Sequence, residues 1–273
     1  MVEVAHLSRG LVPWPGRLVW LRVALVAIVA VAWEVVARSG LLYRDVVPSL
    51  LVIMRALAVV LTTPSFYGHL AVTAGEVAAA LVLGGGFGIA IGLALGVSRF
   101  LSRAFEHFLY WLGPTPKIIF FPILIMWCGV GPASKIGMGA ISAFFPIVLS
   151  VASGLRAIDP VLVRVGRSFN AGWWPMMAKI YLPAMRVPIL NGIRLGFGVA
   201  LIGTLLAETK LSNAGIGFLI MNAYSLFNMP AMYAMLIVLF ALAIAVNELL
   251  GTLIGPHGHV SPSDKVARQR GNP

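Results

Sequence analysis

Long apolar runs alternate with short polar intervals along this chain, and the apolar runs are long enough to cross a membrane. A helix needs about 20 apolar residues to span about 30 Å of hydrocarbon. The pattern predicts six transmembrane helices, at about Leu18–Val36, Leu70–Val97, Ile118–Val130, Ala133–Leu155, Pro188–Glu208 and Ala231–Ile254. We therefore expect an all-α integral membrane domain over residues 18–254, with polar tails at 1–17 and 255–273.

Three further segments are apolar but too short to cross. Pro48–Thr63 is predicted to be an interfacial helix or part of a long external loop. Leu101–Leu112 is predicted to be an interfacial helix, and Arg99 and Arg103 are expected to mark a loop before it. The glycine-rich Leu211–Ala223 is predicted to insert part of the way, which is allowed only where protein or water covers its backbone.

Prolines interrupt the predicted third span. Pro114 and Pro116 precede Lys117 and cannot continue a regular helix, so the backbone must break there. Pro122 is expected to loosen the helix that follows. The span is therefore short for a full crossing, and either the helix before the break contributes to it or it lines a cavity.

Small residues recur every fourth position in two of the predicted spans. They are Gly84, Gly88, Gly92 and Gly96 in the second span and Gly192 and Gly196 in the fifth. Glycines at this spacing let helix backbones approach closely in lipid. A phosphate-binding loop at Gly84–Gly86 is disfavoured because no Gly-Lys-Ser/Thr sequence follows.

Composition supports a membrane protein. Hydrophobic residues make up 60% of the 273 residues and charged residues 11%, with a mean hydropathy of +0.95. One globular core cannot bury so much apolar surface. The formal charge of +11 is spread singly between apolar runs, so lipid headgroups are a better counterpart than nucleic acid.

The longest polar interval, Asp159–Pro183, is predicted to be a cytoplasmic loop. Cytoplasmic segments of membrane proteins are enriched in lysine and arginine. Placing both tails in the cytoplasm leaves only a minority of the basic residues outside: Arg38, Arg44, Arg55, Lys135 and Lys210. This assignment puts the interval, with Arg164, Arg167 and Lys179, on the inner side.

The interval resembles the EAA loop of ABC importer permeases, whose pattern is Glu-Ala-Ala, three residues, Gly, nine residues, then Ile-x-Leu-Pro. Ile180–Pro183 matches at the right spacing, whereas Arg164, Val165 and Gly166 replace Glu-Ala-Ala and Asn170 replaces Gly. Other segments are similar to the nitrate, taurine and sulfonate branch of that family: Trp33-Glu34, Pro48-Ser49, Thr115-Pro116-Lys117 with Pro122 and Trp127, Ala207-Glu208-Thr209 and Ser212–Phe218.

The resemblance implies a type I importer permease in a bacterial inner membrane. Two such subunits would form the pathway, cytoplasmic ATPase subunits would bind ATP and Mg²⁺, and an external binding protein would deliver the solute. The loop, residues 156–183, would lie between spans four and five and carry a coupling helix that docks on the ATPase. The docking residues implied are Leu162, Arg164, Val165, Gly166, Arg167, Phe169, Asn170 and Gly172.

Helical spacing is compatible with docking. Leu162, Val165 and Phe169 would share one face, and Arg164 and Arg167 another. Asparagine enters the left-handed region more readily than most residues, so Asn170 suits the turn. Arg164 reverses the charge that glutamate offers the ATPase. The alternative for the two arginines is a basic face that meets only water and lipid headgroups.

Polar residues near the spans are candidates for the translocation pathway. The resemblance places Lys117, Pro122, Glu208 and Asn213 there. Acidic groups in lipid are costly and usually face a cavity or a partner. Glu208 either handles the solute or ties down the Ser212-Asn213 turn through hydrogen bonds, and both interpretations remain open.

We expect no catalysis, cofactor or metal on this chain, because its histidines lack metal-site spacing and its serines lack a nucleophile motif. Two other classes compete with the permease: an ion-coupled carrier that uses Glu76 or Glu208 for protons, and a permease-like scaffold that transports nothing. A basic outer face formed by Arg44, Arg55, Lys135 and Lys210 would suit nitrate, sulfonate, taurine, bicarbonate or an aromatic carboxylate.

Overall fold

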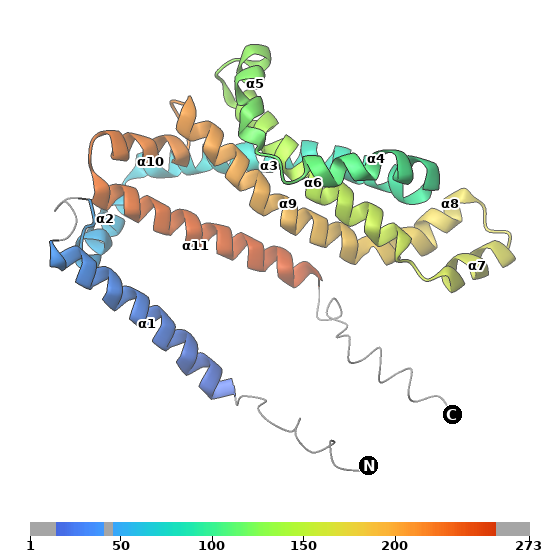
Figure 1. The fold of residues 1–273 in the computed structure, drawn as a ribbon, viewed down its shortest axis with the longest axis horizontal. Coiled ribbons are helices and arrows are strands. Elements are labelled where there is room, and N and C mark those ends of the chain that lie inside the picture. Colours follow the sequence, from blue (N-terminus) through green and yellow to red (C-terminus); the bar gives the residue numbers. More distant parts are fainter. Residues whose placement is uncertain (1–14, 41–45, 255–273) are drawn as a thin grey trace, which may run out of the picture.

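The computed structural model describes residues 15–40 and 46–254 (Figure 1). Regular structure within these residues is helical throughout. The α-helices are α1 (Pro15–Ser39), α2 (Leu50–Thr62), α3 (Pro64–Val97), α4 (Arg99–Leu112), α5 (Phe121–Cys128), α6 (Pro132–Arg156), α7 (Pro160–Ser168), α8 (Trp173–Met176), α9 (Leu182–Lys210), α10 (Ile216–Ser225) and α11 (Met229–Ile254). A 3-10 turn (Lys117–Phe120) precedes α5 and a π-helical turn (Met177–Tyr181) precedes α9. The predicted tail at 255–273, and most of that at 1–17, lie outside the described residues.

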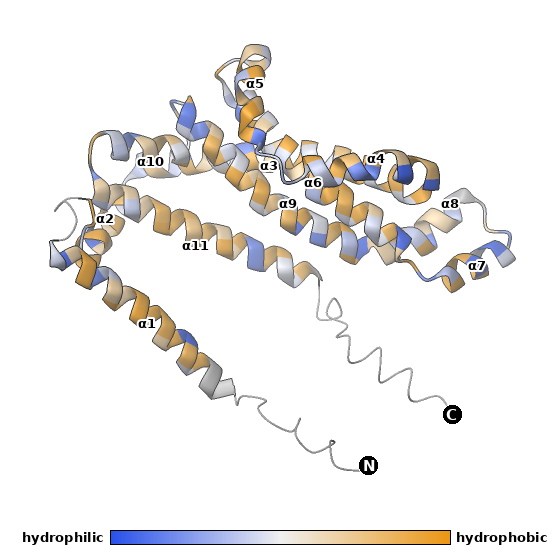
Figure 2. Cartoon of the chain, viewed as in Figure 1, coloured by the Kyte–Doolittle hydropathy of each residue, from blue (hydrophilic) through white to orange (hydrophobic). Residues whose placement is uncertain are grey.

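Five described helices are long and apolar enough to cross a membrane: α1, α3, α6, α9 together with the turns before it, and α11. A bent pair, α4 and Lys117–Cys128, meets at 94° and is apolar enough to form either a sixth, broken span or a re-entrant loop. Apolar residues cover much of the surface of α1 and α11 (Figure 2). The predicted all-α membrane fold is confirmed, and the bend lies at the predicted break between Leu112 and Lys117.

Helix α6 lies between α3 and α9 at the centre of the fold (Figure 1). Ile147 of α6 is fully buried between Gly88 of α3 and Gly196 of α9. A Cβ atom at these glycines would lie 2.9 Å and 2.6 Å from the Ile147 side chain, too close for any real contact. The three helices therefore pack at a distance that only glycine permits.

The other glycines of the two stripes make similar contacts with α6. Gly84 lies against the backbone of Ala140, and the remaining close pairs are Gly92 with Val151, Gly96 with Leu155 and Gly192 with Ser150. Dispersion forces between closely fitted surfaces hold helices together in lipid, where no water is released by their association. The two glycine stripes are therefore the surfaces through which α3 and α9 pack against α6.

Several helices have a proline in their first turn, whereas Pro188 lies inside one. Pro122 lies in the first turn of α5, where a missing N–H costs nothing, so it starts that helix and does not loosen it as we predicted. Pro183 likewise lies in the first turn of α9, which begins before the predicted Pro188. Pro188 lies inside α9, where the Ser150 hydroxyl donates a hydrogen bond to its carbonyl at 2.8 Å.

The predicted loop at Arg99 and Arg103 is wrong. Both residues lie in α4, which begins directly after Ser98. The Ser98 hydroxyl accepts a hydrogen bond from the Leu101 N–H at 3.2 Å and caps this helix. Ser98 alone, in an extended conformation, connects α3 to α4, whereas the sequence suggested a longer loop.

Candidate functional site

Helix α7 has defined signals at both ends. The Asp159 carboxylate accepts a hydrogen bond from Val161 N at 2.8 Å, and Pro160 occupies the first turn. At the other end Asn170 adopts the left-handed conformation that we expected, with φ of 48°. Ala171 N donates to Gly166 O at 3.1 Å and Asn170 N to Arg167 O at 2.9 Å, which is a Schellman cap.

Much of the α7 surface has no protein partner in the described part of the chain. Gly166 is buried against Met176 and Ile180, on the segment that leads into α9. The apolar side chains expected on one face are solvent-accessible: Leu162 49%, Val165 49% and Phe169 82%. Arg164 and Arg167 are exposed too, as is Gly172 in the following turn. An exposed apolar surface with a polar rim is typical of a site that binds a protein or a membrane surface.

An ion pair joins α4 to the end of α6, immediately before α7. Arg156 donates to the Glu106 carboxylate at 2.6 Å and to the Ser102 hydroxyl at 3.0 Å. Ser102 in turn donates to Glu106 at 2.6 Å. The end of α6, directly before α7, is therefore tied to α4.

At the opposite end of α9, side chains from two helices hold the start of α10. Three amides in this region each donate one hydrogen bond: Gly215 N to His69 Nδ1 at 3.1 Å, Ile216 N to Thr73 Oγ1 at 2.8 Å and Gly217 N to Glu208 Oε2 at 2.6 Å. A helix start has N–H groups that no intrahelical carbonyl can satisfy. Side chains of α3 and α9 supply these acceptors.

Glu208 belongs to a buried cluster with Glu76 and Lys135, which come from α9, α3 and α6 and are each at most 4% exposed. The buried Oε2 atom of Glu76 has no hydrogen-bond partner among the described residues. The Lys135 ammonium donates to the carbonyls of Val130 and Gly131.

Two sequence-based interpretations change at this end, those of Glu208 and Lys135. Glu208 does tie down a turn, but through Gly217 and not through Ser212-Asn213. Lys135 is 2% exposed and therefore adds no charge to an outer face, contrary to our prediction, because its ammonium caps carbonyls at the start of α6. Lys117 hydrogen-bonds to the carbonyls of Gly113 and Thr115, and its ammonium lies 5.0 Å from the centre of the Phe145 ring.

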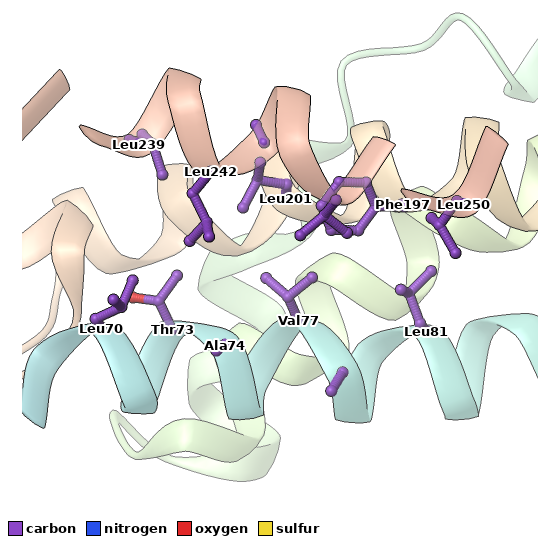
Figure 3. A pocket seen from close by; sticks show the side chains of 13 residues that line it. Leu70, Thr73, Ala74, Val77, Leu81, Phe197, Leu201, Leu239, Leu242 and Leu250 are labelled. Atoms are coloured by element: carbon purple, nitrogen blue, oxygen red, sulfur yellow. The ribbon is translucent and has the colours of Figure 1, made fainter. Parts of the chain in front are cut away.

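Two pockets differ in their chemistry. An apolar one of about 260 Å³ lies between α3, α9 and α11, and Figure 3 shows Leu70, Val77, Phe197 and Leu242 around it with Thr73 as a polar member. A second one of about 440 Å³, which we call the polar pocket because Lys210, Asn213 and Asn222 are among its lining residues, lies at the end of α9 and beside α10. Glu208 and Asn213 line the polar pocket together, whereas Lys117 and Pro122 are not among its lining residues.

Two of the motifs behind the family resemblance contact each other. Trp33 Nε1 donates to Pro48 O at 3.1 Å, and Glu34 accepts from Leu50 N at 3.0 Å. The end of α1 is thereby tied to the start of α2. Among residues 15–40 and 46–254, no group of three or more metal-ligating side chains is placed to hold an ion.

Comparison with known proteins identifies the family. Residues 84–257 match the family described as binding-protein-dependent transport system inner membrane component. The chain belongs to this family. It is 31% identical over 212 residues to a protein named as an aliphatic sulfonates transport permease, SsuC, of Bacillus subtilis, covering 77% of each chain.

Other relatives have different named solutes. The taurine transport system permease protein TauC of Escherichia coli is 26% identical over 268 residues, covering 94% of this chain and 98% of that protein. The riboflavin transport system permease protein RibX of Chloroflexus aurantiacus is 26% identical over 155 residues, covering 57% and 58%. The resemblance to the sulfonate and taurine branch is therefore confirmed, and the relatives are permease subunits, not enzymes.

Sequence reasoning missed His69 and Thr73 and did not connect Glu76 with Glu208. A signal was present, since His69, Thr73 and Glu76 follow an i, i+4, i+7 spacing on one face of an otherwise apolar helix. Polar residues inside a membrane helix usually face a partner. That stripe could have indicated a contact with another polar segment, although it could not have identified α10.

Proposed function

We propose that this chain is the membrane-spanning subunit of an ATP-driven, binding-protein-dependent importer of a small organic anion. Two copies, or one copy and a paralogue, form the pathway. ATP and Mg²⁺ bind to cytoplasmic ATPase subunits, and a binding protein on the other side delivers the solute. The chain lies in a bacterial inner membrane with both termini in the cytoplasm.

The exposed surface of α7 is the observation that carries this proposal. Leu162, Val165 and Phe169 are too exposed for residues that have no further partner, and Arg164 and Arg167 lie beside them. Burial of apolar surface stabilises a complex by roughly 25 cal/mol per Å². We assign this surface, with Gly166, Asn170 and Gly172 shaping its turn, to docking on the ATPase.

Named relatives support an organic anion as the solute. The names of SsuC and TauC refer to aliphatic sulfonates and to taurine, both of which carry a sulfonate group. For this chain the pathway residues proposed are Glu208 and Asn213 at the polar pocket, with Lys117 and Pro122 shaping the break before α5.

Co-expression with an ATPase subunit of the same type of importer tests the proposal. We expect the two proteins to copurify, and the reconstituted assembly to hydrolyse ATP faster when a loaded binding protein is added. Uptake that needs no ATPase would indicate an ion-coupled carrier instead. Copurification without any solute-dependent ATP hydrolysis or uptake would indicate a scaffold.

A further inference from the structure

The polar pocket lies at the end of α9 that is farthest from α7 (Figure 1). Helix α9 has 29 residues, so at 1.5 Å per residue the two ends are about 40 Å apart. If α7 meets the ATPase, the pocket opens toward the side from which the solute arrives. Its volume of about 440 Å³ falls within the range of small-molecule sites.

Hydrogen-bond donors line one side of this pocket. Lys210 is exposed and forms no ion pair or hydrogen bond through its side chain within the described chain. Asn213 and Asn222 are exposed as well, and each brings a side-chain amide that can donate. An ammonium next to amide donors favours a compact anionic group.

The acidic residue at the pocket directs its oxygens away from the accessible side. Glu208 is 1% exposed, and its two oxygens accept from Thr73 Oγ1 at 2.7 Å and Gly217 N at 2.6 Å. The carboxylate therefore faces the interior of the bundle. Lys210 provides the net charge on the accessible side.

An apolar wall completes the pocket. Phe218 and Met221 line it from α10, and Met221 is 42% exposed. The Phe218 ring stacks on the His69 ring with centroids 5.8 Å apart, which holds its orientation. A ligand with both a charged head and a short hydrocarbon tail would use both sides of the pocket.

Internal hydrogen bonds hold the wall between α9 and α10. Ser212 Oγ donates to Ala214 O at 2.7 Å, and the amides of Gly215, Ile216 and Gly217 are bonded to His69, Thr73 and Glu208. Binding to a wall that is already ordered avoids the entropic cost of fixing it.

We propose that this pocket binds a small organic anion, with its charged head on Lys210 and the amides of Asn213 and Asn222 and its tail against Phe218 and Met221. The assignment rests on the proposed import function and adds a residence site for the solute on the permease itself. It predicts a preference for an alkanesulfonate or similar monoanion over a neutral analogue.

Direct binding tests the assignment without requiring transport. The purified full-length chain in lipid nanodiscs would be equilibrated with labelled butanesulfonate or methanesulfonate. Lys210→Gln should raise Kd for both at least tenfold, whereas Arg55→Gln, which removes an exposed cation from α2 outside the pocket, should change Kd less than twofold. Met221→Ser should weaken butanesulfonate about threefold and leave methanesulfonate unchanged.

Two results would overturn the assignment: no butanesulfonate binding by the unaltered chain at millimolar concentration, or equal binding by the Lys210→Gln and Arg55→Gln variants. ATP-driven uptake is measured separately in proteoliposomes. If Lys210→Gln raises Kd but the unaltered chain shows no ATP-driven uptake, only the import function is contradicted. If uptake occurs but Lys210→Gln does not raise Kd, only the pocket assignment is contradicted.

Discussion

The Thr73 hydroxyl on α3 donates a hydrogen bond to Glu208 on α9 at 2.7 Å and accepts one from the backbone of α10 at 2.8 Å. One side chain thus joins three segments that are far apart in the sequence. Because all the atoms involved are buried, none of these groups can form a replacement hydrogen bond with water if the hydroxyl is lost.

Replacement of Thr73 by valine should destabilise the protein strongly. Valine has nearly the same shape but leaves Ile216 N without an acceptor and removes a donor to Glu208. Each unsatisfied buried group costs about 1–3 kcal/mol, so we expect a loss of roughly 2–4 kcal/mol. Thermal unfolding in detergent measures it. Thr73→Ser retains the hydroxyl and should stay within about 1 kcal/mol of the parent, and equal Tm values for both variants would contradict this role.

Glycine substitutions in α3 should have opposite effects on its two sides. A Cβ at Gly92 would lie 2.7 Å from Val151, whereas nothing lies within 4 Å of one at Gly86. We expect Gly92→Ala to cost about 1–3 kcal/mol through overpacking, and Gly86→Ala to stabilise the helix by up to about 1 kcal/mol. Their Tm values, compared in one detergent, test the prediction. Similar shifts for the two variants would show that α3 does not contact α6 through this stripe.

The cap of α7 predicts a clear order among substitutions at Asn170. Glycine suits the left-handed conformation better than asparagine, whereas alanine in that region costs roughly 1–2 kcal/mol. We therefore expect Asn170→Gly to preserve ATPase docking and Asn170→Ala to weaken it. Copurification yield with the ATPase provides the measurement. An alanine variant that docks as well as the glycine variant would rule out a role for the turn.

Reversing the ion pair between α4 and α6 should be tolerated only when both partners change. Arg156→Glu or Glu106→Arg alone places like charges together, and the double exchange restores attraction. Because Arg156 is 37% exposed, we expect a coupling energy of only about 1 kcal/mol. A double-mutant cycle on coupled ATP hydrolysis measures it. Additive effects of the two changes would mean that the pair transmits nothing.

The sequence predicts features that depend on local residues better than features that depend on contacts between distant segments. Hydropathy located the long helices, because lipid imposes a minimum apolar length on each. Local signals also held, as Asn170 in its left-handed turn shows. In contrast, the buried position of Lys135 depends on contacts that only the folded chain creates, so residue type alone indicated an exposed cation. The same holds for Glu208, whose partners Thr73 and Gly217 come from different helices.

The most direct test of the account is coupling through α7. The variant carrying both Arg164→Glu and Arg167→Glu would be reconstituted with its ATPase and binding protein, next to an Arg99→Glu/Arg103→Glu control that reverses two exposed charges on α4. We expect uptake per ATP hydrolysed to fall at least tenfold in the α7 variant and to change little in the control. Normal assembly, hydrolysis and uptake by the α7 variant would contradict the assignment of this surface to the ATPase.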